Sequence, residues 1–177
     1  MKAVQLLPGF KSGSDASSGL YVRGGSPDQN LVMIDDVPLY YVDHLGGFVS
    51  IFNADIISDV KLVKGSFPAR YGSRLSSVVD MRMRDGNMKK REVNGAVGLI
   101  TTKFSIEGPI KKDTSSFLIS ARRFMYDILM IPVSKLIQNG GWVGYSFYDI
   151  NGKYNNIFSD SDRLYLSFFL GEDNLVM

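Results

Sequence analysis

The chain contains no cysteine, a single histidine and no long apolar run, and each absence narrows what it can be. Without cysteine there is neither a disulfide scaffold nor a thiolate metal site. The longest apolar stretch, Ile128 to Val133, falls far short of the roughly 20 residues of a membrane helix. Membrane barrel strands are shorter and only half apolar, so this composition does not exclude them. The 20 basic and 18 acidic residues are nearly balanced and form no basic stripe, so we expect no nucleic-acid partner.

Motifs for catalysis and for cofactor binding are also missing. Gly24-Gly25 fits neither of the glycine-rich patterns that bind phosphates, and there is no G-x-S-x-G elbow for serine chemistry. One histidine, His44, cannot build a metal site by itself, and the pair Asp35-Asp36 lacks the alternating ligands of a calcium loop. We therefore predict no catalytic residue, no metal site and no cofactor.

The 18 glycines, 9 tyrosines and 11 phenylalanines are typical of a β-rich protein with many turns. In the first half, the near-continuous apolar run Leu31–Asp35 predicts a buried strand, and alternation predicts half-buried strands over Val60–Val63 and Val78–Arg82. These apolar faces need one another for burial, which predicts one small sheet. The stretch 50–58 approaches helical spacing and predicts a short helix.

The second half consists of segments of alternating polarity that are separated by polar turns. After a charged connector, its pattern predicts strands over Glu92–Leu99, Lys103–Ile110, Ser115–Asp127, Val143–Ile157 and Arg163–Glu172. Val97 and Phe104 have opposite parity, so one strand cannot hold both on one face, and a turn or bulge is expected near residues 100–102.

The connections between these strands differ in length. Residues 111–114 and 159–162 are short polar turns, whereas 128–142 is a long apolar and then glycine-containing connection. Short turns at one end and a long loop at the other are typical of outer-membrane barrels, but an ordinary antiparallel meander fits the same pattern. In the last strand, one face is apolar and consists of Leu164, Leu166, Phe168 and Leu170.

Several motifs, taken in order along the chain, resemble the TonB-dependent outer-membrane receptors. Leu20–Asn30 resembles the family's Arg-Gly-Gly strand and turn, and Leu31–Tyr40 its strand ending in Asp-Gly-Val-Pro, with Asp36 where glycine is usual. Residues 57–83, which include Ala69-Arg70-Tyr71-Gly72, resemble the end of the plug domain. Gly108-Pro109-Ile110 and residues 149–154 resemble early barrel strands of receptors common in Bacteroidetes-type bacteria.

The resemblance implies an α+β plug domain, a small mixed sheet with short helices, over residues 1–87. It implies that residues 88–177 are the first strands, about five, of a transmembrane β-barrel that is incomplete in this chain. No signal peptide is visible in residues 1–9, so we expect the chain to be a fragment of an exported protein. The implied location is the outer membrane of a Gram-negative cell, with the plug inside the barrel lumen.

The function implied by the resemblance is active import of a nutrient such as a metal-siderophore, cobalamin or a glycan. The plug gates the lumen, and the TonB energy-transducing complex pulls on it through a segment expected upstream of Met1. The other implied partners are the extracellular nutrient and outer-membrane lipid, and the resemblance also allows a surface lipoprotein. It implies a ligand-facing loop that carries Tyr40, Tyr41, Asp43 and His44, and arginines that seat the plug against the barrel wall, namely Arg23, Arg70 and Arg74.

Two other classes of protein stay open on the residues alone. A soluble β-rich interaction domain would pack the aromatic faces of the second half as a sandwich core. An enzyme would need an acid, base or nucleophile constellation, and none is visible in the sequence. On the residues alone, Arg23, Arg70 and Arg74 could be solvated loop charges, and His44, beside Asp43, an ordinary loop residue.

Overall fold

A computed structural model of the chain describes residues 10–12, 20–22, 25–40, 43–44, 49–51, 53–66, 68–72, 74–128 and 144–176. The chain divides into two compact units, Met1–Met83 and Arg84–Met177. The domain boundary predicted after residue 87 falls within the connector that opens the second unit. Among the described residues, no helix has the length and apolar character needed to cross a membrane.

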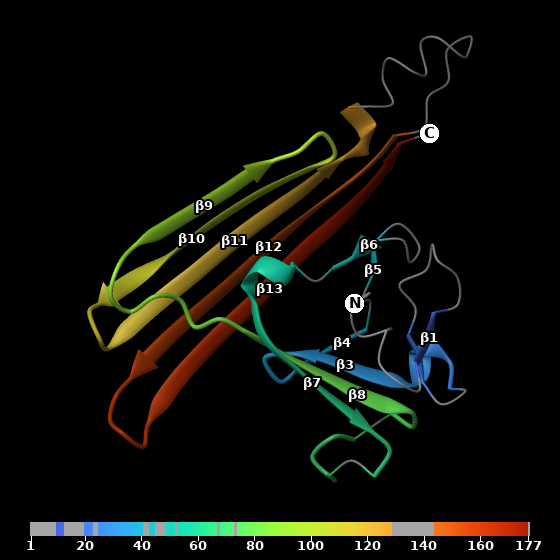
Figure 1. The fold of residues 1–177 in the computed structure, drawn as a ribbon, viewed down its shortest axis with the longest axis horizontal. Coiled ribbons are helices and arrows are strands. Elements are labelled where there is room, and N and C mark those ends of the chain that lie inside the picture. Colours follow the sequence, from blue (N-terminus) through green and yellow to red (C-terminus); the bar gives the residue numbers. More distant parts are fainter. Residues whose placement is uncertain are drawn as a thin grey trace. The chain divides into compact units, whose positions relative to one another are not determined.

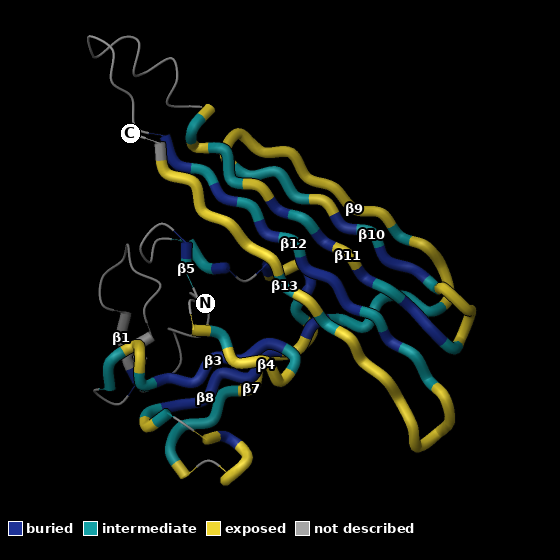
Figure 2. The backbone as a smooth tube through the Cα atoms, turned by 180° about the vertical axis from the view of Figure 1, so that it is seen from behind, coloured by how far each residue is buried: buried dark blue, intermediate teal, exposed yellow. Residues whose placement is uncertain are grey.

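The first unit is built around a four-stranded mixed sheet with the strand order β4-β3-β8-β7 (Figure 1). β3 (Asn30–Ile34) runs parallel to β8 (Ser77–Met83), whereas β4 (Val37–Leu39) and β7 (Ile57–Lys64) pair antiparallel with their neighbours. The two central strands are almost wholly buried (Figure 2). This sheet joins the three strands that the apolar patterns predicted, and it confirms the mixed-sheet fold class.

Both faces of this sheet are covered by apolar packing. Val22, from β2 (Leu20–Val22), packs with Val32, Val79 and Met81 on one face. On the other face, Tyr71 packs with a second cluster of buried side chains, namely Leu31, Met33 and Val78. Burial from both sides explains why β3 reads as a continuous apolar run instead of an alternating one.

The smaller elements of the first unit are short. β1 (Phe10–Ser12) pairs with β2, η1 (Pro27–Gln29) precedes β3, and β5 (Asp43–His44) pairs with β6 (Val49–Ser50). The helix predicted within residues 50–58 is only the 3-10 turn η3 (Ala54–Ile56), capped by the Asn53 side chain. A single turn costs nucleation entropy without propagation, and the β-branched pair Ile56-Ile57 favours the strand that follows.

The turn between β3 and β4 contains two aspartates in the left-handed region. Asp35 has a φ of 46° and Asp36 a φ of 65°. Two positive φ values are characteristic of the tight hairpin turns that favour Asn-Gly or Asp-Gly. The backbone N–H of Met83 donates to Asp35 Oδ1 at 3.0 Å, so this carboxylate also ties the turn to β8. Asp36 thus adopts a positive φ at the position where the family usually has glycine.

We predict that Asp36→Gly stabilises the first unit by about 0.5–1 kcal/mol, because glycine adopts positive φ without a Cβ clash. The lost contact with Arg82 is exposed and 3.8 Å long, and such pairs contribute little. Urea unfolding of residues 1–83 measures the change. The matched control is Asp35→Gly, which also removes the hydrogen bond from Met83 and should give no gain. Equal gains in the two variants would contradict this account of the turn.

The second unit is one antiparallel sheet in which five strands follow one another in chain order. The strands are β9 (Glu92–Val97), β10 (Thr101–Lys111), β11 (Ser115–Met125), β12 (Gly144–Ile157) and β13 (Arg163–Val176). β9 and β13 each pair on one side only among the described strands, so this sheet is not closed. The long connection predicted over 128–142 lies almost entirely outside the described residues.

The turn predicted near residues 100–102 separates β9 from β10, and Gly98 N–H donates to the Thr101 carbonyl at 2.9 Å. The turn returns Val97 to the face that also carries Phe104. β10 contains a bulge between Pro109 and Lys111, beyond the last pairing with β9. There the missing N–H of Pro109 costs no ladder bond on the β9 side.

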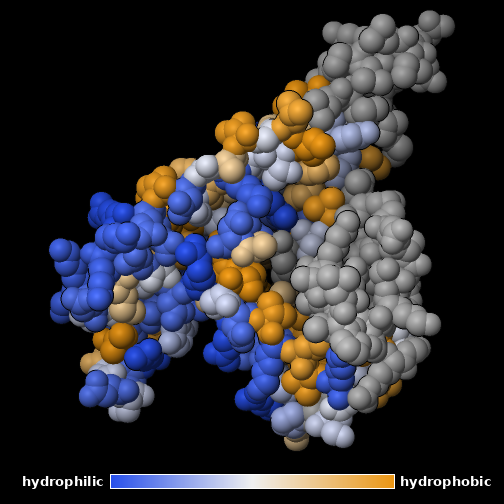
Figure 3. All heavy atoms as spheres, viewed as in Figure 1, coloured by the Kyte–Doolittle hydropathy of each residue, from blue (hydrophilic) through white to orange (hydrophobic). Residues whose placement is uncertain are grey.

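The strand register separates the side chains of this sheet into an apolar face and a polar face. Large apolar residues exposed on the first include Val93, Val97, Phe104, Ile119, Leu164, Leu166, Phe168 and Leu170. The opposite face carries Lys103, Ser105, Glu107, Ser120, Arg122, Asp149, Asn151, Lys153 and Asp173. Hydrophilic residues gather at the end of the sheet with the two short turns (Figure 3). The face predicted for the last strand thus extends across the whole sheet.

Candidate functional site

The polar face of the five-stranded sheet holds a buried ion pair between β11 and β12. Arg122 and Asp149 are register partners, and Arg122 Nε donates to Asp149 Oδ2 at 2.6 Å. A second guanidinium nitrogen contacts the same carboxylate, whose side chain is fully buried. Taking two charges out of water is costly unless their geometry is good, and here the pair is directly hydrogen-bonded.

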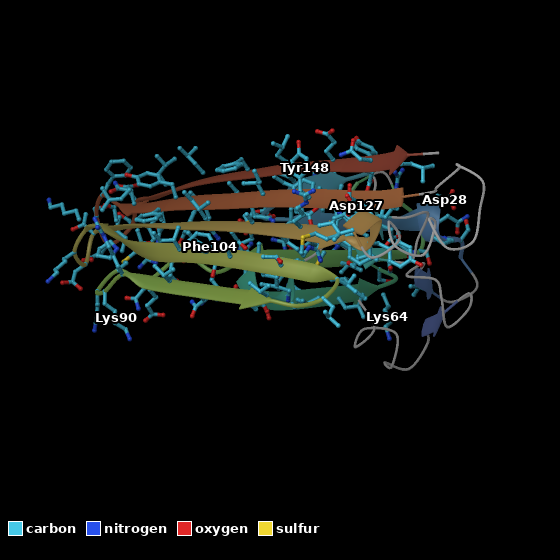
Figure 4. The ribbon with its side chains drawn as sticks, turned by 90° about the horizontal axis from the view of Figure 1, so that it is seen from above. Asp28, Lys64, Lys90, Phe104, Asp127 and Tyr148 are labelled. Atoms are coloured by element: carbon cyan, nitrogen blue, oxygen red, sulfur yellow. The ribbon has the colours of Figure 1, made fainter. Side chains whose placement is uncertain are left out.

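Aromatic rings surround this pair toward the end of β11. The Arg122 guanidinium lies 5.1 Å from the centroid of the Phe147 ring, which stacks on Phe124 at 5.0 Å. Tyr145 packs at the edge of Phe124 and donates its hydroxyl to Asp173 on β13. Figure 4 shows Asp127, just beyond this end of β11, and Lys90 toward opposite ends of the sheet. Phe147, Tyr145, Arg122 and Asp149 are all buried, so the rings enclose the ion pair in apolar packing.

In the first unit, the loop after β7 is held across the sheet by one tyrosine. The Tyr71 hydroxyl donates to Asp80 Oδ2 at 3.1 Å, and Arg70 donates to that hydroxyl at 2.5 Å while its guanidinium lies over the Tyr71 ring. Asp80 is buried on β8. The Tyr71 hydroxyl therefore connects the exposed guanidinium of Arg70 to the buried carboxylate of Asp80.

The same loop is tied to η1 at its other end. The N–H groups of Leu75 and Ser76 both donate to the Gln29 carbonyl, and the Ser76 hydroxyl donates to the Val22 carbonyl at 2.7 Å. A Cβ added at Gly25 would lie 2.6 Å from Ser76 Oγ, so the contact requires glycine. This is the physical reason for the second glycine of the Arg-Gly-Gly motif, Gly25.

The described residues among those predicted to face a ligand differ in their exposure. Tyr40, just after β4, is 80% exposed, whereas His44 in β5 is buried and Asp43 half-buried. Tyr41 lies outside the described residues. Of the described pair of predicted seating arginines, Arg70 is exposed and Arg74 half-buried, and Arg23 also lies outside the described residues. Their roles stay predictions.

In the part of the chain that the structure describes, no group of three or more histidine, aspartate or glutamate side chains is arranged to hold a metal ion. Four buried charged residues on the polar face each lie in an ion pair, namely Glu107, Arg122, Asp149 and Lys153. Sequence reasoning missed them as a set. The available signal was parity, because each occupies a polar-face position of its own strand, but pairing them requires the register between strands.

We predict that Arg122→Met destabilises the protein by about 3 kcal/mol or more, because the Asp149 carboxylate then stays buried without its guanidinium partner. Urea denaturation measures the loss. The double variant Arg122→Met/Asp149→Leu removes both charges and should recover most of the stability. Losses that simply add in the double variant would show that the two residues act independently.

Comparisons with known proteins agree with this fold. Residues 1–79 match the family model of the TonB-dependent receptor plug domain. No curated protein sequence matches the chain. Among solved structures, the chain is similar to the siderophore receptor PirA from Acinetobacter baumannii, with a TM-score of 0.67 and 17% identity over 99% of this chain. PirA from Pseudomonas aeruginosa is similar at a TM-score of 0.67 and 16% identity, again over 99% of this chain.

The chain spans 29% and 30% of the lengths of these two receptors, so the likeness concerns their fold over that part. The family match coincides with the first unit up to Val79, within β8. The structural matches extend through the antiparallel strands of the second unit. The first unit is therefore a TonB-dependent receptor plug domain, and the whole chain has the fold of such a plug followed by the first strands of an unclosed β-barrel.

Proposed function

We propose that the chain is part of an outer-membrane receptor that binds a nutrient outside the cell and imports it actively, with the plug gating the barrel lumen. The observation that carries the proposal is the division of the five-stranded sheet into two faces. An apolar outer face with a polar inner face is the arrangement of strands that meet lipid on one side and a lumen on the other.

Strand length and composition support this proposal. β10 and β11 each have 11 residues, which is enough for a tilted strand to cross the hydrocarbon core of a bilayer, about 9–11 residues. Phe168 covers the gap at its register partner Gly152, where an added Cβ would lie 2.0 Å from the ring. The apolar face is therefore continuous even where a strand has no side chain.

In this proposal the polar face lines the lumen that encloses the plug. The energy-transducing complex of the inner membrane pulls on the plug from the periplasm, and Arg23, Arg70 and Arg74 seat it against the wall. The loop that faces the ligand begins at Tyr40 and also carries Tyr41, Asp43 and His44. Lipid and a surface lipoprotein are the other partners that we propose.

The nutrient class is the finer part of the proposal. The two similar solved structures are siderophore receptors, so a metal-siderophore is the first ligand to test, followed by cobalamin and oligosaccharides. Uptake of each radiolabelled ligand is compared between cells with the complete gene and cells in which it is deleted. We expect uptake of one class to require both the gene and the proton-motive force. Uptake that is unchanged by deletion for all three classes would refute the proposal.

A soluble β-rich interaction domain is the alternative function. It would have to cover the apolar face with protein, although Leu166, Phe168 and Leu170 are all more than half exposed. Contiguous exposed apolar surface of this kind marks contact with a membrane or a partner. Substitution on the two faces of β13 separates the alternatives.

We predict that Leu166→Arg in the complete receptor lowers its unfolding free energy in lipid vesicles by about 2–4 kcal/mol, because a charge then faces the hydrocarbon core. The neighbouring variant Ser167→Arg places the same charge on the polar face and should cost much less. Urea titration of the two variants in vesicles measures the difference. Equal costs at residues 166 and 167 would contradict lipid contact and favour the soluble domain.

A further inference from the structure

The second unit begins with a connector, residues 84–91, that leads to β9. Its first two residues contact three neighbouring strands of the sheet, β10, β11 and β12. Arg84 directly follows β8, and its NH1 nitrogen lies 2.9 Å from Glu107 Oε1 on β10. The next residue, Asp85, places Oδ1 2.9 Å from the Lys153 ammonium on β12. Between them, the Ser116 hydroxyl on β11 donates to the Asp85 carbonyl at 2.6 Å. The positive charge of Arg84 thus meets the negative charge of Glu107, and the negative charge of Asp85 meets the positive charge of Lys153.

The wall residues at these contacts are buried, whereas the connector residues are partly exposed. The side chains of Glu107 and Lys153 are only 5% and 6% exposed. A carboxylate and an ammonium so far from water are costly without a charged partner, and Arg84 and Asp85 supply one to each. Breaking either contact would leave a buried charge unpaired, which costs more free energy than breaking an exposed pair such as that of Lys90 with Glu92.

At Gly86 the backbone of the connector lies so close to β11 that there is no room for a side chain. Gly86 has a φ of 82°, and a Cβ added there would lie 2.5 Å from the Phe117 carbonyl oxygen. Two residues later, the Met88 carbonyl accepts a hydrogen bond from the N–H of Asp113 in the β10–β11 turn. Both glycine conformation and backbone pairing are required for this path.

We propose that residues 84–88 and their wall partners Glu107, Ser116 and Lys153 form a clamp that fixes where the movable part of the chain ends. When the plug is pulled, strands up to Met83 can be drawn out, and the clamp holds residue 84 on the wall, so that β9 is not peeled from the sheet. The inference rests on the proposed function in one respect, namely that the plug is the part that is pulled.

Single-molecule pulling tests the clamp directly. The complete receptor is held in a supported bilayer and pulled from the N-terminal end of its plug until the plug has unfolded. We expect the released chain to end at residue 83. In Arg84→Gln/Asp85→Asn, release should continue to β9 and add the eight residues 84–91, a contour length of roughly 28 Å.

Two controls separate the clamp from general weakening of the barrel. Lys90→Gln removes the exposed pair of the same connector and should leave the stopping point unchanged. The exchange Arg84→Glu/Glu107→Arg should stop release at residue 83 again, whereas Arg84→Glu alone should not. Release through residue 91 in the unaltered receptor, or an exchange that releases as much chain as Arg84→Glu, would overturn the clamp. Neither outcome depends on uptake, so a receptor that imports nothing but stops at residue 83 would refute only the proposed function.

Discussion

The register between neighbouring strands of the second unit is the constraint on which the rest of that unit depends. Once Arg122 stands opposite Asp149, every residue of even number on β11 and of odd number on β12 lies on the polar face. A shift by one residue would bury apolar side chains among charges and expose charged ones on the apolar face. The buried ion pair therefore matters for specifying one pairing more than for the free energy it contributes, since buried pairs often contribute little to net stability.

The plug domain solves a different problem, because its central strands are buried on both sides. Tyr71 and Val22 cover opposite faces of one small sheet; Tyr71 comes from a loop and Val22 from the three-residue strand β2. Hydrogen bonds from backbone and side chains therefore hold these segments in place, as Ser76 does for the chain at Val22.

The connector at the start of the second unit is held to the sheet by paired charges. Buried charges on the polar face are costly without a charged partner, and two of them, Glu107 and Lys153, pair with the first residues of the second unit. These ion pairs also fix the path of the chain at the start of the second unit.

Sequence pattern alone determined the strands and their faces. Period-two alternation predicted all five strands of the second unit to within a few residues, and the parity conflict between Val97 and Phe104 located the turn between the first two. The apolar run of β3 predicted burial on both sides, and motif order predicted the plug family. These features are local, because side-chain direction in a strand follows from the backbone itself.

Only the tertiary structure decided which residues meet. That Arg84 pairs with Glu107, that Asp85 pairs with Lys153, and that Tyr71 reaches Asp80 depends on strand register and loop path, which local sequence does not encode. The helix expected within residues 50–58 became one 3-10 turn because the adjoining strand gained more from pairing with β8 than a short helix gains by itself. Local patterns set each strand's two faces, and the burial of charge set the partners.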